Sequence, residues 1–178
     1  MENYLSDFTE YLEEKKAMAQ NSLLAYRRDV QDFYAFLQGK GITAPHDVTK
    51  TEVIAYLLAL KNQDKSAATV NRKLASLRAF FHYLGSYKGL PQDPTEGIKS
   101  PKIERKKLEY LTVEEVEELL TKPDDSVKGR RDKALLEILY ASGMRVSEVA
   151  GTDLSNINLR IGFIMTDGEF GKARIIPL

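Results

Sequence analysis

Hydrophobic residues recur at helical spacing in four stretches of the first half of the chain. Spacings of three and four place them on one face of a helix and leave polar residues on the other face. The four expected helices cover Glu2–Lys16, Ser22 to about Gly39, Thr51 to about Leu60, and Ser66 to about Leu84, with Thr49 as the cap of the third. The pattern therefore predicts a four-helix domain over residues 1–98.

The second half of the chain begins with a helical pattern and ends with an extended one. Thr112 and Glu115 match a capping box, and they start a short helix whose apolar side chains should point inward, namely Val113, Val116, Leu119 and Leu120. Another helix is expected from about Arg130 to Gly143. Two strands follow, at Leu159–Met165 and Ala173–Leu178, around the turn residues Asp167, Gly168 and Gly171. The predicted fold class is mainly α: a four-helix domain, then the start of an α+β domain with helices and a β-hairpin.

A proline-containing, basic segment separates the two halves. Three prolines occur between Pro91 and Leu108, and the basic side chains that follow one another there are Lys99, Lys102, Arg105, Lys106 and Lys107. We expect residues 99–109 to link the first domain to a second at residues 110–178. Such a linker would lie along a DNA backbone, where each neutralised phosphate releases counterions. The alternative is a linker that is basic only because it stays solvated.

Composition excludes several classes of protein. The 178 residues include no cysteine, and His46 and His82 show no ligand spacing, so we expect no disulfide framework, no metal site and no cofactor. No apolar run approaches the roughly 20 residues that span a membrane, and the N-terminus lacks the order of a signal peptide, which favours a cytoplasmic protein. The net charge of zero argues against a uniformly basic nucleic-acid binder. Whether the chain can bind nucleic acid therefore depends on where its charges lie.

Two of the expected helices carry arginines on a polar face. On the fourth helix, Asn71, Arg72 and Arg78 lie at helical spacing with small alanines between them, while Arg27 and Arg28 project near the start of the second. Small residues beside arginines let a helix approach a DNA groove while the arginines reach phosphates or base edges. An ordinary solvated face is the alternative interpretation.

One arginine is placed in a turn between two apolar helices. Arg145 follows the helix-ending Gly143, and Glu148 comes three residues later. We expect a buried turn that fixes a guanidinium, which is the preferred group for two-pronged binding of a phosphate, with the carboxylate holding its rotamer. The alternative is a purely structural pair in which Arg145 caps the preceding helix.

The run ALLEILYASGMRVSEVAGTDLSNINL resembles the first catalytic box of the tyrosine recombinases, most closely the bacterial Xer recombinases, and Ser66–Leu84 and Asp93–Leu120 agree in the same order. The resemblance implies that Arg145 holds the scissile phosphate and that Glu148 supports it. It also implies that the second and fourth helices contact duplex DNA, through Arg27, Arg28, Arg72 and Arg78. The implied partners are double-stranded DNA and another recombinase protomer.

The hairpin departs from the family's pattern. In the family a lysine of this hairpin is the general acid, and the matching position here is Glu169, with Lys172 as a substitute nearby. The family's other functional groups, including the tyrosine nucleophile, follow the hairpin, whereas all nine tyrosines here lie at or before Tyr140. We therefore expect the DNA-binding, N-terminal portion of a recombinase, inactive as it stands. The alternative is a non-enzymatic helical module that binds DNA or protein and modulates an intact recombinase.

Overall fold

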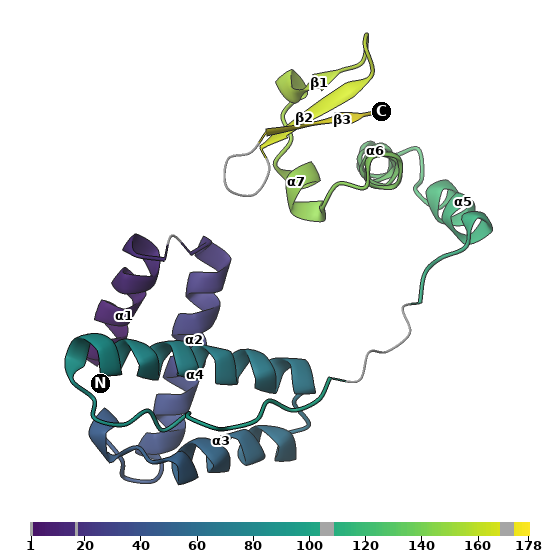
Figure 1. Cartoon of the computed structure of the whole chain (residues 1–178). Coiled ribbons are helices and arrows are strands. Elements are labelled where there is room, and N and C mark those ends of the chain that lie inside the picture. The colour runs from purple at the N-terminus through teal and green to yellow at the C-terminus, as the bar shows by residue number, and fades with distance from the viewer. Residues whose placement is uncertain (1, 17, 104–108, 168–172) are drawn as a thin grey trace. The chain divides into compact units, whose positions relative to one another are not determined.

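The computed structural model of the chain describes residues 2–16, 18–103, 109–167 and 173–178 (Figure 1). Two compact units divide the chain, Met1–Arg105 and Lys106–Leu178, here the N-terminal unit and the C-terminal unit. The first holds α1 (Glu2–Glu14), α2 (Gln20–Gln38), η1 (Pro45–Asp47), α3 (Lys50–Asn62) and α4 (Ala67–Lys88). The second holds α5 (Val113–Thr121), α6 (Val127–Ser142), α7 (Val146–Ala150), η2 (Leu154–Asn156), β1 (Ile157–Asn158), β2 (Phe163–Asp167) and β3 (Ala173–Pro177). The predicted fold class is confirmed.

The N-terminal unit is organised around α4, which packs against α1, α2 and α3. Phe8, Phe33, Phe80 and Phe81 are fully buried at the centre of the unit. The ring of Phe80 lies 5.2 Å from that of Phe8 and 5.4 Å from that of Phe81, in edge-on arrangements that aromatic pairs favour. One aromatic core therefore holds the four helices together.

The predicted cap at Thr49 and the predicted capping box at Thr112 both form, and Thr49 also takes part in a capping box. The backbone N–H of Thr49 donates to Glu52 Oε2 at 2.9 Å, which closes the start of α3. At the start of α5, the Thr112 N–H donates to Glu115 Oε2 at 2.8 Å and the Glu115 N–H donates to Thr112 Oγ1 at 3.2 Å. These reciprocal bonds satisfy N–H groups that have no partner inside a helix.

Several predicted helix ends were wrong, and α1 ends at Glu14 instead of Lys16. Helix α2 begins at Gln20 without a side-chain cap, and α6 begins at Val127, where Ser126 Oγ accepts from the Gly129 N–H at 3.0 Å. Helix α4 continues past Leu84 to Lys88 and ends at Gly89, whose φ is 70°.

Tertiary packing explains the longer α4. The rings of Tyr83 and Tyr87, in its last turns, lie 4.9 and 5.1 Å from the ring of Tyr11 on α1. This contact between two helices reaches beyond the local apolar stripe, which is why the stripe alone placed the end of α4 too early.

The C-terminal unit carries a three-stranded antiparallel sheet in the order β1-β2-β3. Ile164 pairs with Ile176 across β2 and β3, and Met144, Val149 and Ile164 form a small core. The hairpin was predicted, but β2 begins at Phe163 instead of Leu159, and β1 was not predicted.

The inward orientation expected for the apolar side chains of α5 was partly wrong. Val113 and Leu119 are exposed, and no residue of this helix is buried in the part of the chain that the structure describes. No described helix is both long and apolar enough to cross a membrane.

Candidate nucleic-acid interface and phosphate site

Arg145 occupies the first position before α7. Gly143 ends α6 in the left-handed conformation, with φ 61°, and Met144 is buried beneath the turn. The Arg145 N–H donates to Glu148 Oε2 at 2.8 Å, and Arg145 Nη1 donates to Glu148 Oε1 at 3.2 Å. The Arg145 side chain is 58% exposed, so the expected burial of this turn was wrong. The structure thus brings Arg145 and Glu148 together, with more than half of the arginine side chain exposed.

A second arginine joins this pair from the sheet. Arg174 on β3 donates through Nη2 to the same Glu148 Oε1 at 2.5 Å, and its side chain is 47% exposed. Glu148 itself is only 9% exposed. One carboxylate therefore accepts hydrogen bonds from the guanidinium groups of two partly exposed arginines. Residues 26 apart in sequence meet here, so local spacing could not reveal Arg174 as part of the site.

Its surroundings keep Glu148 ionised. The hydrogen bond from the Arg145 backbone N–H is the largest effect that lowers the pKa of this carboxyl below its ordinary value of 4.5, and the charges of Arg174 and Arg145 lower it further. Partial burial opposes the shift without reversing it. At neutral pH the group is a carboxylate able to orient both arginines.

The pH dependence of this site follows from that direction. A pKa lowered by folding means that the stabilisation from Glu148 is present above pH 4.5 and is lost as the pH falls below it. We expect the NMR signals of the Arg145 and Arg174 side-chain N–H groups to shift together as the pH is lowered through this range. In Glu148→Gln that shared transition should be missing; its persistence in the variant would show that Glu148 does not hold the two arginines.

Four predicted site residues lie outside the described residues. These are Glu169 and Lys172 in the hairpin, and Arg105 and Lys106 in the linker. Their roles remain predictions from the sequence and the family resemblance.

The arginines of α2 and those of α4 differ in their contacts. Arg27 and Arg28 are exposed on α2. On α4, Arg72 donates to the buried carboxylate of Asp29, and Arg78 donates to the carbonyl oxygen of Ile98 and, at 3.3 Å, to Ser100 Oγ. Arg72 and Arg78 therefore support the fold as well as lying on the predicted DNA-facing helix.

The beginning of the linker is bound to α4. Asn71 Nδ2 donates to the carbonyl oxygen of Pro101 at 2.9 Å, and Ile98 is buried in the core of the N-terminal unit. Together with the Arg78 contacts, these bonds hold residues 98–101 against the helix. The linker is thus fixed on the N-terminal unit at its start.

Four lysines gather around one hollow of the N-terminal unit. Lys99 and Lys102, both predicted to bind DNA, line it together with Lys61 and Lys65 from the end of α3 and the residues after it. Apolar side chains such as Ile54 and Leu58 form other parts of its lining. We had not predicted Lys61 and Lys65, because only the fold places them beside the linker. Clustered lysines of this kind attract a phosphate backbone.

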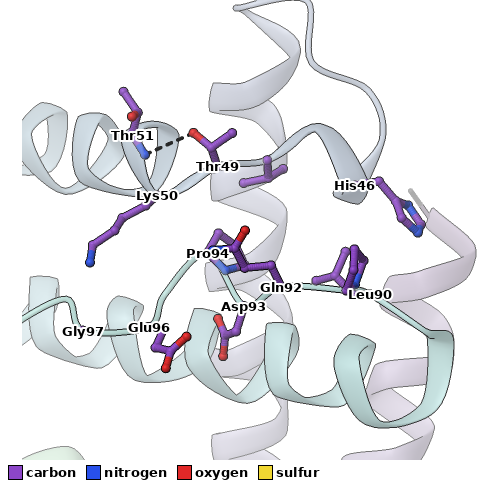
Figure 2. Close-up of a pocket in the computed structure, with 12 residues that line it drawn as sticks. His46, Thr49, Lys50, Thr51, Leu90, Gln92, Asp93, Pro94, Glu96 and Gly97 are labelled. Carbon is purple, nitrogen blue, oxygen red and sulfur yellow. Dashed lines mark hydrogen bonds between the residues drawn. The ribbon is translucent and has the colours of Figure 1, made fainter.

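A second hollow of the N-terminal unit has mixed charge. Figure 2 shows Thr49, Lys50 and Thr51 at the start of α3 facing the segment from Leu90 to Gly97, around a cavity of about 530 Å³. Lys50 is accompanied there by the carboxylates of Asp93 and Glu96. Two acids against one lysine make this hollow a poor phosphate site. Among the described residues, no group of three or more acidic or histidine side chains could hold a metal ion.

Comparisons with known proteins show the family of the chain. The model for the "Phage integrase, N-terminal SAM-like domain" matches residues 5–88, and the model for the "Phage integrase family" matches residues 109–178. A putative tyrosine recombinase from Caldanaerobacter subterraneus is 41% identical over 178 residues, covering 99% of this chain and 60% of that protein. The chain belongs to the tyrosine recombinase family.

Further relatives of this tyrosine recombinase chain carry Xer names. Tyrosine recombinase XerD of Listeria monocytogenes is 36% identical and XerC of Roseiflexus castenholzii is 35% identical, each over 180 residues and 100% of this chain, and over 61% and 57% of those proteins. The chain therefore spans about 60% of the length of the curated relatives it matches.

Solved structures share the fold of the recombinase chain. A lambda integrase dimer bound to a COC′ core site matches with a TM-score of 0.79 at 17% identity, over 99% of this chain and 62% of that one. The Tn1549 transposon integrase in complex with transposon right end DNA matches with a TM-score of 0.72 at 16% identity, over 98% and 60%. The resemblance seen in the sequence is confirmed.

Proposed function

We propose that this chain is the DNA-binding portion of a site-specific tyrosine recombinase acting in the cytoplasm. The N-terminal unit holds duplex DNA through Arg27, Arg28 and the four lysines that line the hollow beside the linker, Lys61, Lys65, Lys99 and Lys102. Arg145 binds the scissile phosphate. The observation that carries this proposal is the single carboxylate of Glu148, which holds the two exposed guanidinium groups of Arg145 and Arg174. Arginines fixed by an acid behind them are suited to two-pronged binding of a phosphate.

The contacts of each arginine determine which variants test DNA binding without also disturbing the fold. Reversing the charge of Arg72 or Arg78 would also disturb Asp29 or the docked linker, so loss of binding would be ambiguous. Arg27 and Arg28 are exposed, and neither forms an ion pair with another described residue. The double reversal Arg27→Glu with Arg28→Glu should weaken duplex binding at least about tenfold, because two phosphate contacts become repulsive.

The matched control is Lys15→Glu with Lys16→Glu, which changes the net charge equally at the end of α1, outside the proposed interface. Affinities are measured by fluorescence anisotropy on one labelled duplex. If both double variants weaken binding equally, the effect is one of net charge and the proposed interface is wrong.

A second expectation is that the chain alone forms no covalent adduct with DNA. Burial raises the pKa of Tyr34, Tyr56 and Tyr83, so these phenols are neither accessible nor readily ionised. The resemblance gives the nucleophile's role to none of the nine tyrosines. A nicked substrate that traps covalent intermediates should therefore yield no shifted band on a denaturing gel.

The exposed Tyr87, Tyr110 and Tyr140 provide the internal check on that experiment. A band that survives denaturation and vanishes in one of the three Tyr→Phe variants would refute the proposal that this portion is inactive, and it would identify the nucleophile.

A further inference from the structure

A buried carboxylate lies behind one arginine of α4. Asp29 on α2 is 0% exposed, and its Oδ2 accepts hydrogen bonds from Arg72 Nη1 and, at 2.8 Å, from Ser76 Oγ. Its Oδ1 accepts from Lys73 Nζ at 3.1 Å, and the same ammonium donates to Asp32 Oδ2 at 2.6 Å. These three donors to Asp29 all belong to α4, so the carboxylate joins the two helices.

Lys73 is the buried counter-ion of Asp29. Burial tends to lower the pKa of Lys73, but its hydrogen bonds to Asp32 and Asp29 outweigh that effect and raise the pKa above its ordinary value. The ammonium is therefore charged at neutral pH, and the buried carboxylate has a counter-ion beside it. Lys73 is shared with Asp32, whose side chain is 52% exposed, so Arg72 is a second cation at the buried carboxylate of Asp29.

Arg72 is held at one end and open at the other. Its Nη1 is bound to Asp29, yet its side chain remains 45% exposed. A guanidinium has five N–H donors in a rigid plane, so fixing one nitrogen also fixes the directions of the remaining donors. A side chain that is already ordered loses less entropy when it binds a ligand.

We propose that Asp29 is a positioning residue that fixes Arg72 for binding a DNA phosphate. This inference rests on the proposed function, because it assumes that the surface of α4 faces the duplex. It extends that function, because a buried carboxylate that never touches DNA would then help to bind the DNA backbone.

The direction in which DNA affinity changes distinguishes a positioning role of Asp29 from a general effect of its negative charge. Asp29→Asn and Asp32→Asn each remove one negative charge, and a more positive protein should bind DNA more tightly. Asp32 pairs with the same Lys73 but makes no described contact with Arg72, so it is the matched control. Positioning predicts that Asp29→Asn weakens binding although the charge change favours it.

The test measures anisotropy of a labelled duplex with the full chain at one salt concentration. Asp29→Asn should lower affinity about tenfold, the size of one charge-assisted hydrogen bond, whereas Asp32→Asn should leave it equal or higher. In an Arg72→Gln background, Asp29→Asn should cause no further loss. Affinity of Asp29→Asn at or above the unchanged chain, or the same tenfold loss without Arg72, would overturn the inference.

One further variant covers the case in which Asp29→Asn fails to fold, as circular dichroism would reveal. Arg72→Lys keeps the charge but replaces the planar fork by a point charge, and we expect about tenfold weaker binding with helix content intact. Unchanged affinity would overturn the inference. If the unchanged chain shows no salt-dependent DNA binding at all, both the inference and the proposed function are wrong. If DNA binding is unchanged by both Asp29→Asn and Arg72→Lys, only the role of Asp29 is refuted.

Discussion

Replacing Phe80 with alanine is expected to destabilise the N-terminal unit by about 3–5 kcal/mol, the cost of removing a fully buried aromatic ring and leaving a cavity. Phe80 is completely buried on α4, with the rings of Phe8, Tyr34 and Phe81 at 5.2, 5.5 and 5.4 Å. These neighbours belong to α1, α2 and α4, so closing the cavity would require three helices to move. A loss of this size can unfold a unit of ordinary stability.

Hydrogen exchange followed by mass spectrometry measures this effect within the N-terminal unit alone. Protection of peptides from α1 to α4 should collapse in Phe80→Ala, while peptides of the C-terminal unit should be unaffected. His82→Ala is the control, because His82 lies on the same helix but is exposed. Equal protection in the two variants would show that Phe80 is not the centre of the core.

The largest catalytic effect is expected at Glu169, in a chain joined to the remainder of a family-like catalytic domain. There, Glu169→Lys should accelerate DNA cleavage about 10²- to 10⁴-fold, the usual contribution of a general acid. A carboxylate cannot act as a cationic proton donor, and it adds negative charge where the transition state already accumulates it. The expectation rests on the family's hairpin motif, since Glu169 lies outside the described residues.

A substrate whose 5′-bridging oxygen is replaced by sulfur isolates this step, because sulfur leaves without needing a proton. Glu169→Lys should accelerate cleavage of the normal substrate with little gain on the sulfur one, and Lys172→Ala should change little. If Lys172→Ala alone abolishes cleavage and sulfur restores it, then Lys172 is the acid and the assignment of Glu169 is wrong.

Local chemistry made part of the fold predictable. Thr49 was expected as a helix cap and Thr112 with Glu115 as a capping box, and both formed. Gly143 supplied the left-handed residue that ends α6. Such signals depend on neighbours within one helical turn, which is why they can be read from the sequence.

Features that depend on distant residues escaped prediction. The burial of Lys73 on α4 was not predicted, because its counter-charge comes from Asp29, 44 residues earlier. Arg145 was expected in a buried turn but is exposed, since Met144 takes the place beneath it. Its partner Arg174 arrives through the strand register of β2 and β3. Helical periodicity carries no information on such pairings.

The salt dependence of duplex binding tests the central claim most directly. If the N-terminal unit and the linker neutralise about six phosphates, the logarithm of the binding constant should fall against the logarithm of salt concentration with a slope of roughly −5. The measurement requires only the unchanged chain and one labelled duplex titrated across a salt series. A slope near −5 supports a DNA-binding portion of a tyrosine recombinase, whereas a slope near zero, or no binding at low salt, would contradict it.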